Sequence, residues 1–67
     1  MKTYTAKQLR LERGLTQEDL AKNLGVSRGS IWIWESGTGK IGDLNRYKVA
    51  RFFGVEPEQI VDAGLEE

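Results

Sequence analysis

Residues 16–37 read TQEDLAKNLGVSRGSIWIWESG and contain two helix-like runs separated by a glycine. Thr16, followed three residues later by Asp19, forms the capping-box pattern that begins a helix, and Ser27 is a favourable cap for the second run. Gly25 permits a tight turn between the runs. The spacing therefore predicts helices over 17–24 and 28–36, joined as a helix-turn-helix.

The same pattern of helix starts and stops continues on both sides of this motif. Thr5 with Gln8 forms another capping-box pattern, and Pro57 suits the first position of a short last helix. Glycines at 14, 37 and 54 each follow a helix-like run. We expect a single domain over residues 1–67 with five helices, at about 5–13, 17–24, 28–36, 43–53 and 57–62.

Apolar residues at helical spacing predict one core shared by these helices. The expected core consists of Leu9, Leu20, Leu24, Ile31, Trp34, Leu44, Tyr47, Ala50, Phe53 and Ile60. The stretch from Ile31 to Trp34 is β-prone by composition, but a lone strand would have no partner in this chain. The expected fold class is all-α, a compact five-helix bundle.

Composition excludes several classes of function. The chain has 67 residues and contains neither cysteine nor histidine, so it lacks the commonest metal ligands and the usual general base near neutral pH. No apolar run approaches the roughly 18 residues of a membrane span. Gly37-Thr-Gly-Lys40 fails as a phosphate loop because Ile41 follows the lysine. We expect no enzyme, no cofactor, metal or small-molecule ligand, no membrane segment and a cytoplasmic location.

The charges are unevenly distributed although the net charge is +0. Residues 1–54 hold ten bases and five acids, so they carry +5, whereas residues 55–67 hold five acids and no base. A basic body and an acidic end fit a polar docking face directed away from the tail.

One face of the second motif helix is expected to point away from the core. With Ile31 and Trp34 turned inward, the residues left outside near its start are Ser27, Arg28, Gly29, Trp32 and Ile33. These are the positions that a recognition helix presents to base edges in a major groove. Glu35 is expected to pair with Arg10 or Arg13.

The chain resembles the phage-repressor (Cro-like, also called XRE-like) helix-turn-helix family over about residues 5–62. The matching segments are RLERGLTQEDLAKNLGVSRGSI at 10–31, WESG at 34–37 and ARFFGV at 50–55. The resemblance implies a lambda-repressor-like domain that binds specific double-stranded DNA sequences and regulates transcription, as a repressor. It also implies a prokaryotic or phage-encoded protein that acts as a homodimer on a palindromic operator.

The resemblance also implies roles for individual residues. Thr16 and Gln17 would contact a phosphate at the start of their helix. Ser27 and Arg28 open the recognition helix, and Arg28 is the best candidate for reading a guanine through O6 and N7. The flanking backbone contacts would come from Thr38, Gly39 and Lys40. For Arg28, Gln17 and Lys40, the plainer alternative is a solvated side chain or a local ion pair.

Two departures from the family pattern leave alternatives open. Family members usually carry polar side chains where this chain has Gly29, Trp32 and Ile33, and often a proline near position 41. Ile33 could pack on a thymine methyl, while Trp32 could lie on DNA, on neighbouring helices or on a partner. The second hypothesis is therefore a protein-interaction module on the same fold, such as an antitoxin-like partner. The candidate dimer contacts are Phe52, Val55, Val61 and Leu65.

Overall fold

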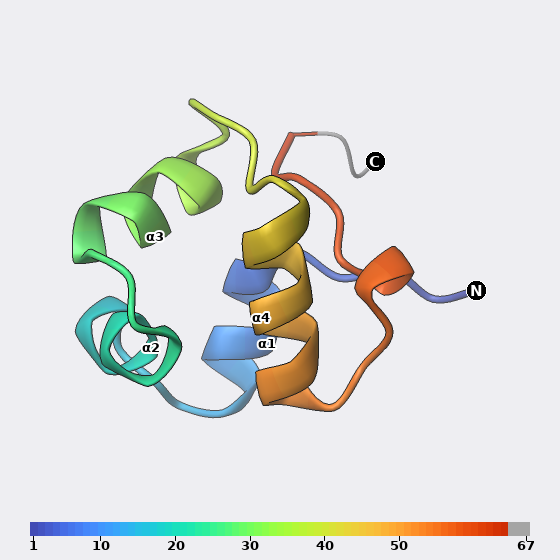
Figure 1. Cartoon of the computed structure of the whole chain (residues 1–67), viewed down its shortest axis with the longest axis horizontal. Helices are drawn as coiled ribbons and strands as arrows, with labels where there is room; N and C mark the ends of the chain where they lie inside the picture. Colours follow the sequence, from blue (N-terminus) through green and yellow to red (C-terminus); the bar gives the residue numbers. More distant parts are fainter. Residues whose placement is uncertain (65–67) are drawn as a thin grey trace.

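The structure, a computed structural model, describes residues 1–64 and consists of helices joined by short connections (Figure 1). Its elements in chain order are α1 (Ala6–Glu12), α2 (Gln17–Leu24), α3 (Arg28–Ser36), α4 (Asp43–Phe53) and the 3-10 turn η1 (Pro57–Gln59). The all-α class is confirmed, and within residues 1–64 no helix is long and apolar enough to cross a membrane.

The expected helix starts are present in atomic detail. The hydroxyl of Thr5 accepts from the backbone N–H of Gln8, and that of Thr16 accepts from Asp19, each within a complete capping box. Ser27 caps α3 by accepting from the backbone N–H of Ser30 at 3.1 Å. Each cap satisfies backbone N–H groups that have no partner inside a helix. The caps fix where α1, α2 and α3 begin, and α1 is slightly shorter than the predicted 5–13.

The helix-turn-helix of α2 and α3 forms as predicted. Gly25 ends α2 in the left-handed conformation, with φ of 70°. The small Ala21 is buried where the helices approach, and Val26 packs against the core from the turn. Figure 1 shows α2 and α3 together on one side of α4. The β-prone residues from Ile31 to Trp34 are helical because cap, turn and buried face agree on a helix.

The core contains most, but not all, of the predicted residues. Leu44 and Tyr47 were predicted wrongly, because 67% and 51% of their surfaces are exposed. On α4 the buried positions are Val49, Ala50 and Phe53, so Leu44 lies on the opposite side of the helix and Tyr47 lies at the edge of the buried face. The buried apolar residues are Ala6, Leu9, Leu20, Ala21, Leu24, Ile31, Trp34, Ile41, Val49, Ala50, Phe53 and Ile60.

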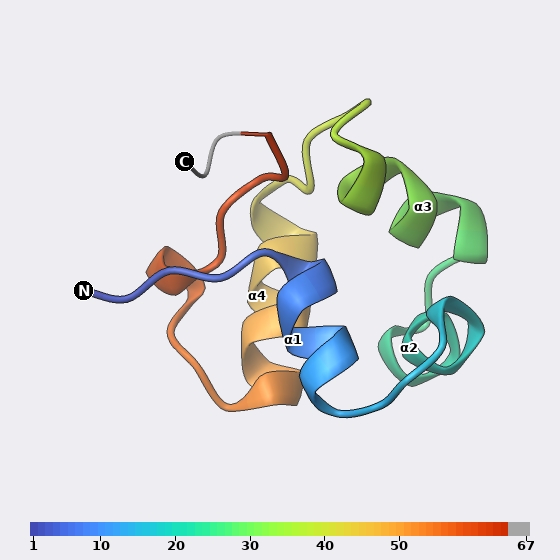
Figure 2. The ribbon, with the colours of Figure 1, turned by 180° about the vertical axis from the view of Figure 1, so that it is seen from behind.

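The predicted fifth helix over 57–62 is wrong beyond its first turn. After η1 the chain becomes extended, and Ile60 forms an isolated parallel bridge with Tyr4. The backbone N–H of Tyr4 donates to the Gln59 carbonyl at 2.7 Å, and that of Val61 donates to the Tyr4 carbonyl at 2.9 Å. Figure 2 shows the N-terminal segment passing beside η1 and the residues that follow it. Since Val61 donates to Tyr4, its N–H cannot continue a helix from η1.

The connection between α3 and α4 is packed against the C-terminal segment. Ile41 is buried, and its backbone N–H donates to the Asp62 carboxylate at 2.9 Å. Gly37 approaches the backbone of Ala63 so closely that a Cβ would lie 3.3 Å from the Ala63 carbonyl oxygen. The acidic segment therefore helps to position this connection.

Candidate nucleic-acid interface

The outer face of α3 carries the predicted reading residues together. Arg28, Gly29, Trp32 and Ile33 are all exposed, with Trp32 at 56% and Ile33 at 40%. A shallow hollow of about 340 Å³ lies between this face and the start of α2, lined by Gln17, Arg28, Gly29 and Trp32. Gly29 lines this hollow, and a Cβ at this position would meet only Ser27 Oγ, at an ordinary contact distance of 3.8 Å.

The inner face of α3 is held by a buried ion pair. Arg10 donates from Nε and Nη2 to the two oxygens of Glu35, at 2.5 and 2.9 Å, in a bidentate arrangement. The third donor of Arg10, Nη1, reaches the Leu15 carbonyl at 2.7 Å. The expected pairing of Glu35 with Arg10 is confirmed, whereas Arg13 donates instead to the Phe53 carbonyl. The helix α3 is therefore tied through Arg10 to α1 and to the connection before α2.

Gln17 joins the same network. Its Nε2 donates to Glu35 Oε1 at 3.0 Å, so its amide bridges the start of α2 to α3. Sequence reasoning missed this contact, because it depends on how α2 and α3 are placed and not on local spacing. For a phosphate, Gln17 retains its backbone N–H and the second hydrogen of its amide.

The start of α2 has Thr16 as its cap and, at Asp19, a carboxyl group with a lowered pKa. Asp19 accepts from the backbone N–H of Thr16 at 3.0 Å, while its own N–H donates to the Thr16 hydroxyl. The hydrogen bonds from the Thr16 backbone and then from its hydroxyl lower the pKa of Asp19 below its usual 3.8. The exposed Thr16 thus lies at the helix terminus, where N–H groups favour an anion.

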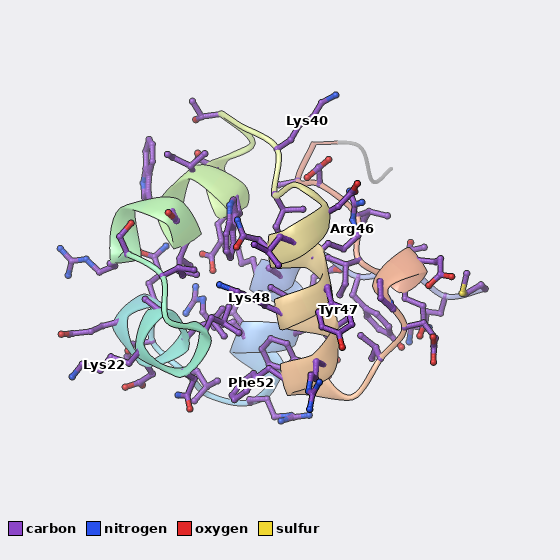
Figure 3. All side chains as sticks on the ribbon, in the orientation of Figure 1. Lys22, Lys40, Arg46, Tyr47, Lys48 and Phe52 are labelled. Atoms are coloured by element: carbon purple, nitrogen blue, oxygen red, sulfur yellow. The ribbon has the colours of Figure 1, made fainter. Side chains whose placement is uncertain are left out.

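The predicted flanking contacts lie in the connection after α3. The hydroxyl groups of Ser36 and Thr38 are 2.7 Å apart, and the Thr38 N–H donates to Ser36 Oγ. Lys40 is exposed and projects outward from this connection (Figure 3). The structure therefore places Thr38 and Lys40 just beyond the end of α3, and Gly39 between them.

The basic side chains are spread over several elements. Figure 3 shows Lys22 on α2, Lys40 after α3, and Arg46 and Lys48 on α4. Of the basic residues, only Arg28 lies in the first turn of α3. In residues 1–64 no group of three acidic, histidine or cysteine side chains could hold a metal ion. The chemistry of the α3 face is thus one guanidinium beside apolar groups.

Comparison with known proteins assigns the chain to a family. The helix-turn-helix family matches residues 7–60. An uncharacterized HTH-type transcriptional regulator of Methanocaldococcus jannaschii is 48% identical over 54 residues, which cover 81% of this chain and 82% of that protein. No solved structure matches the chain.

Two further relatives have opposite regulatory descriptions. The HTH-type transcriptional activator BcrR of Enterococcus faecalis is 41% identical over 81% of this chain but only 26% of its own length. The cryptic phage CTXphi transcriptional repressor RstR of Vibrio cholerae is 34% identical over 82% of this chain and 50% of its length. The prediction of a DNA-binding regulator of transcription is confirmed, and the chain belongs to the helix-turn-helix family.

Proposed function

We propose that this protein binds its operator by inserting α3 into the major groove, with Arg28 reading a guanine. The observation that carries this proposal is the division of α3 into a face fixed by the core and an exposed face that begins at its N-terminus and extends from Arg28 to Ile33. A recognition helix makes its base contacts from these N-terminal residues. The helix is also short enough for its first turns to reach the bases while its end meets the flanking backbone.

Arg28 is suited to direct base reading. Within the part of the chain that the structure describes, its guanidinium takes part in none of the ion pairs, which join Arg10, Lys22 and Arg46 to carboxylates. An unpaired guanidinium has its donors free for the O6 and N7 acceptors of a guanine. Ser27 precedes it, but the Ser27 hydroxyl is occupied by Ser30, which favours a capping role over base contact.

Phosphate contacts would bracket the helix on both sides. The start of α2, at Thr16 and Gln17, offers backbone N–H groups to one phosphate. Thr38, Gly39 and Lys40 lie at the other end of α3 and would meet the backbone next to the site. Such contacts set the register of the helix on the duplex, whereas the base contacts give specificity.

A homodimer on a two-fold symmetric operator completes the proposal. A single recognition helix of this size buries little surface, and two half-sites about one helical turn apart increase it. Among the dimer contacts suggested by the sequence, Phe52 and Val55 pack against the core, and Leu65 lies outside the described residues. The more exposed Leu44 and Tyr47, one turn apart on α4, are better candidates for the dimer contact. Sedimentation of the complex should give two chains per duplex, and one chain per duplex would refute this part.

Repression is the regulatory outcome that we propose. A protein bound to an operator blocks other proteins by occupying the site, so repression requires no contact beyond those to DNA. A reporter gene behind the selected operator should be expressed less when the protein is present. Increased expression would instead place the protein with activators such as BcrR.

The second candidate is a protein-interaction module. The observation that favours it is the pair of exposed apolar side chains, Trp32 and Ile33, where base-reading residues usually lie. Selection of bound duplexes from a random pool, followed by salt titration, separates the two functions. DNA binding should weaken steeply with salt, with a log–log slope of about −0.9 per phosphate contact. A flat salt response, or no bound duplex at low salt, would support the interaction module.

A further inference from the structure

Gly39 lies against the side chain of Ile33. A Cβ at position 39 would be only 2.7 Å from Ile33 Cγ2, closer than such atoms approach in proteins. The backbone does not itself demand glycine here, since Gly39 is not among the glycines with positive φ. The reason for a residue without a side chain at this position is therefore the neighbouring isoleucine.

Ile33 has little freedom to move away. It is β-branched and lies inside α3, where such side chains strongly prefer a single χ1 rotamer. The following turn is also fixed, because the Ser36 hydroxyl donates to the Ile33 carbonyl at 3.2 Å. With Gly39 packed against one methyl group and 40% of the residue exposed, Ile33 presents a rigid apolar surface outward.

We infer that Ile33 is a specificity-determining residue that packs on the C5-methyl group of a thymine, and that Gly39 is its positioning residue. This inference rests on the proposed placement of α3 in the major groove. Ile33 has no polar atom, so it can neither donate to nor accept from a base edge. The C5-methyl of thymine is the apolar group that base edges offer in that groove. The operator should therefore carry a required thymine opposite Ile33 in each half-site.

Replacing single thymines by deoxyuridine tests the inference, because this substitution removes the methyl group and keeps the base pair. Operators selected from the random pool are substituted at one thymine at a time, and the dissociation constant is measured at fixed salt. Loss of one buried methyl contact should weaken binding about three- to fivefold at one position per half-site. The same substitution at other thymines should change binding less than twofold.

The Ile33→Ala variant identifies the protein partner of that methyl. Its dissociation constants for the thymine and deoxyuridine operators should be equal, which is the signature of a direct contact in a double-mutant cycle. If no thymine is sensitive, or if the variant keeps the full discrimination, the inference is wrong while DNA binding stands. If no duplex binds at all, both the inference and the proposed function fail.

The Gly39→Ala variant tests the positioning role. It should reduce the thymine-to-deoxyuridine discrimination of the wild-type protein toward one, because the added methyl displaces Ile33. In the Ile33→Ala background the crowding atom is gone, so adding Gly39→Ala should leave the urea midpoint unchanged. A Gly39→Ala protein that retains full discrimination would show that the close approach does not position Ile33.

Discussion

The sequence Ile31-Trp32-Ile33-Trp34 places two isoleucines and two tryptophans on the same helix, and one residue of each type is buried while the other is exposed. Ile31 and Trp34 are 0% and 7% exposed, whereas Ile33 and Trp32 are 40% and 56% exposed. Composition cannot explain the difference, because each face has one residue of each type. The helical period sends one pair into the core and the other outward. The inner face of α3 therefore serves folding, while the outer face is free for recognition.

The largest expected effect comes from breaking the buried ion pair below the inner face. Glu35→Gln removes the charge facing Arg10, whose side chain is only 10% exposed. An uncompensated buried charge costs about 3–5 kcal/mol, a large share of the stability of so small a domain. Urea denaturation should show the native state lost or its midpoint greatly lowered.

The exposed pair between Glu18 and Lys22 provides the matched control. Its atoms are 3.9 Å apart and both side chains are largely exposed. Glu18→Gln should therefore cost less than about 1 kcal/mol. Equal losses for Glu35→Gln and Glu18→Gln would refute the claim that the inner face holds the motif together.

The two isoleucines give the next test. Ile31→Ala should destabilise the fold by about 2–5 kcal/mol, since it leaves a cavity at a fully buried site. Ile33→Ala should cost less than about 1 kcal/mol of stability, because much of that side chain already meets solvent. Thermal or urea unfolding of the two variants measures this contrast. Similar unfolding free energies for the two variants would mean that the inner face of α3 does not contribute more to stability than the outer face.

Arg28→Ala should affect binding without affecting folding. If Arg28 reads a guanine, the variant loses about 1–3 kcal/mol of operator affinity and relaxes the preference at one base pair. The control is Lys7→Ala, which removes an exposed basic side chain of α1 and should leave the operator affinity nearly unchanged. Fluorescence anisotropy with the selected operator and with single-base variants reports both. Weakening that is uniform across sequences would reassign Arg28 to a phosphate.

The smallest effect is expected at the start of α2. Thr16→Ala removes the cap and should cost about 1 kcal/mol of stability. It should also raise the pKa of Asp19, since the Thr16 hydroxyl is one of the groups that lower it. Because the folded-state pKa of Asp19 is depressed, its contribution to stability is present above about pH 3.8 and is lost as the pH falls through the folded-state value. NMR titration of the carboxyl carbon measures the shift, and an unchanged pKa in the variant would contradict the hydrogen-bond assignment.

Sequence predicted the parts of this molecule that depend on local pattern. The caps at Thr5, Thr16 and Ser27, the turn at Gly25 and the inward Trp34 follow from residue types at fixed spacing. The buried face of α4 was predicted wrongly, because apolar residues lie on more than one side of this helix. Only packing against the other helices selects Val49 over Tyr47 for the core. The bridge between Tyr4 and Ile60 joins residues distant in the chain, which local patterns do not report.

For the candidate interface, the sequence predicted which residues lie on the outer face but not how they are held. Arg28, Trp32 and Ile33 are exposed as expected. The amide of Gln17 on Glu35 and the contact of Gly39 with Ile33 come from the placement of whole elements. Whether each residue contacts DNA remains a prediction for the experiments above.

Isotope-filtered NMR of the labelled protein bound to its selected operator tests the central claim most directly. The proposed arrangement predicts intermolecular NOEs from the side chains of Trp32 and Ile33 to major-groove protons of the bases, including a thymine methyl. It also predicts none from the buried Ile31 and Trp34. NOEs confined to minor-groove protons, or arising from α4 side chains such as Leu44 and Tyr47 instead of α3, would contradict it.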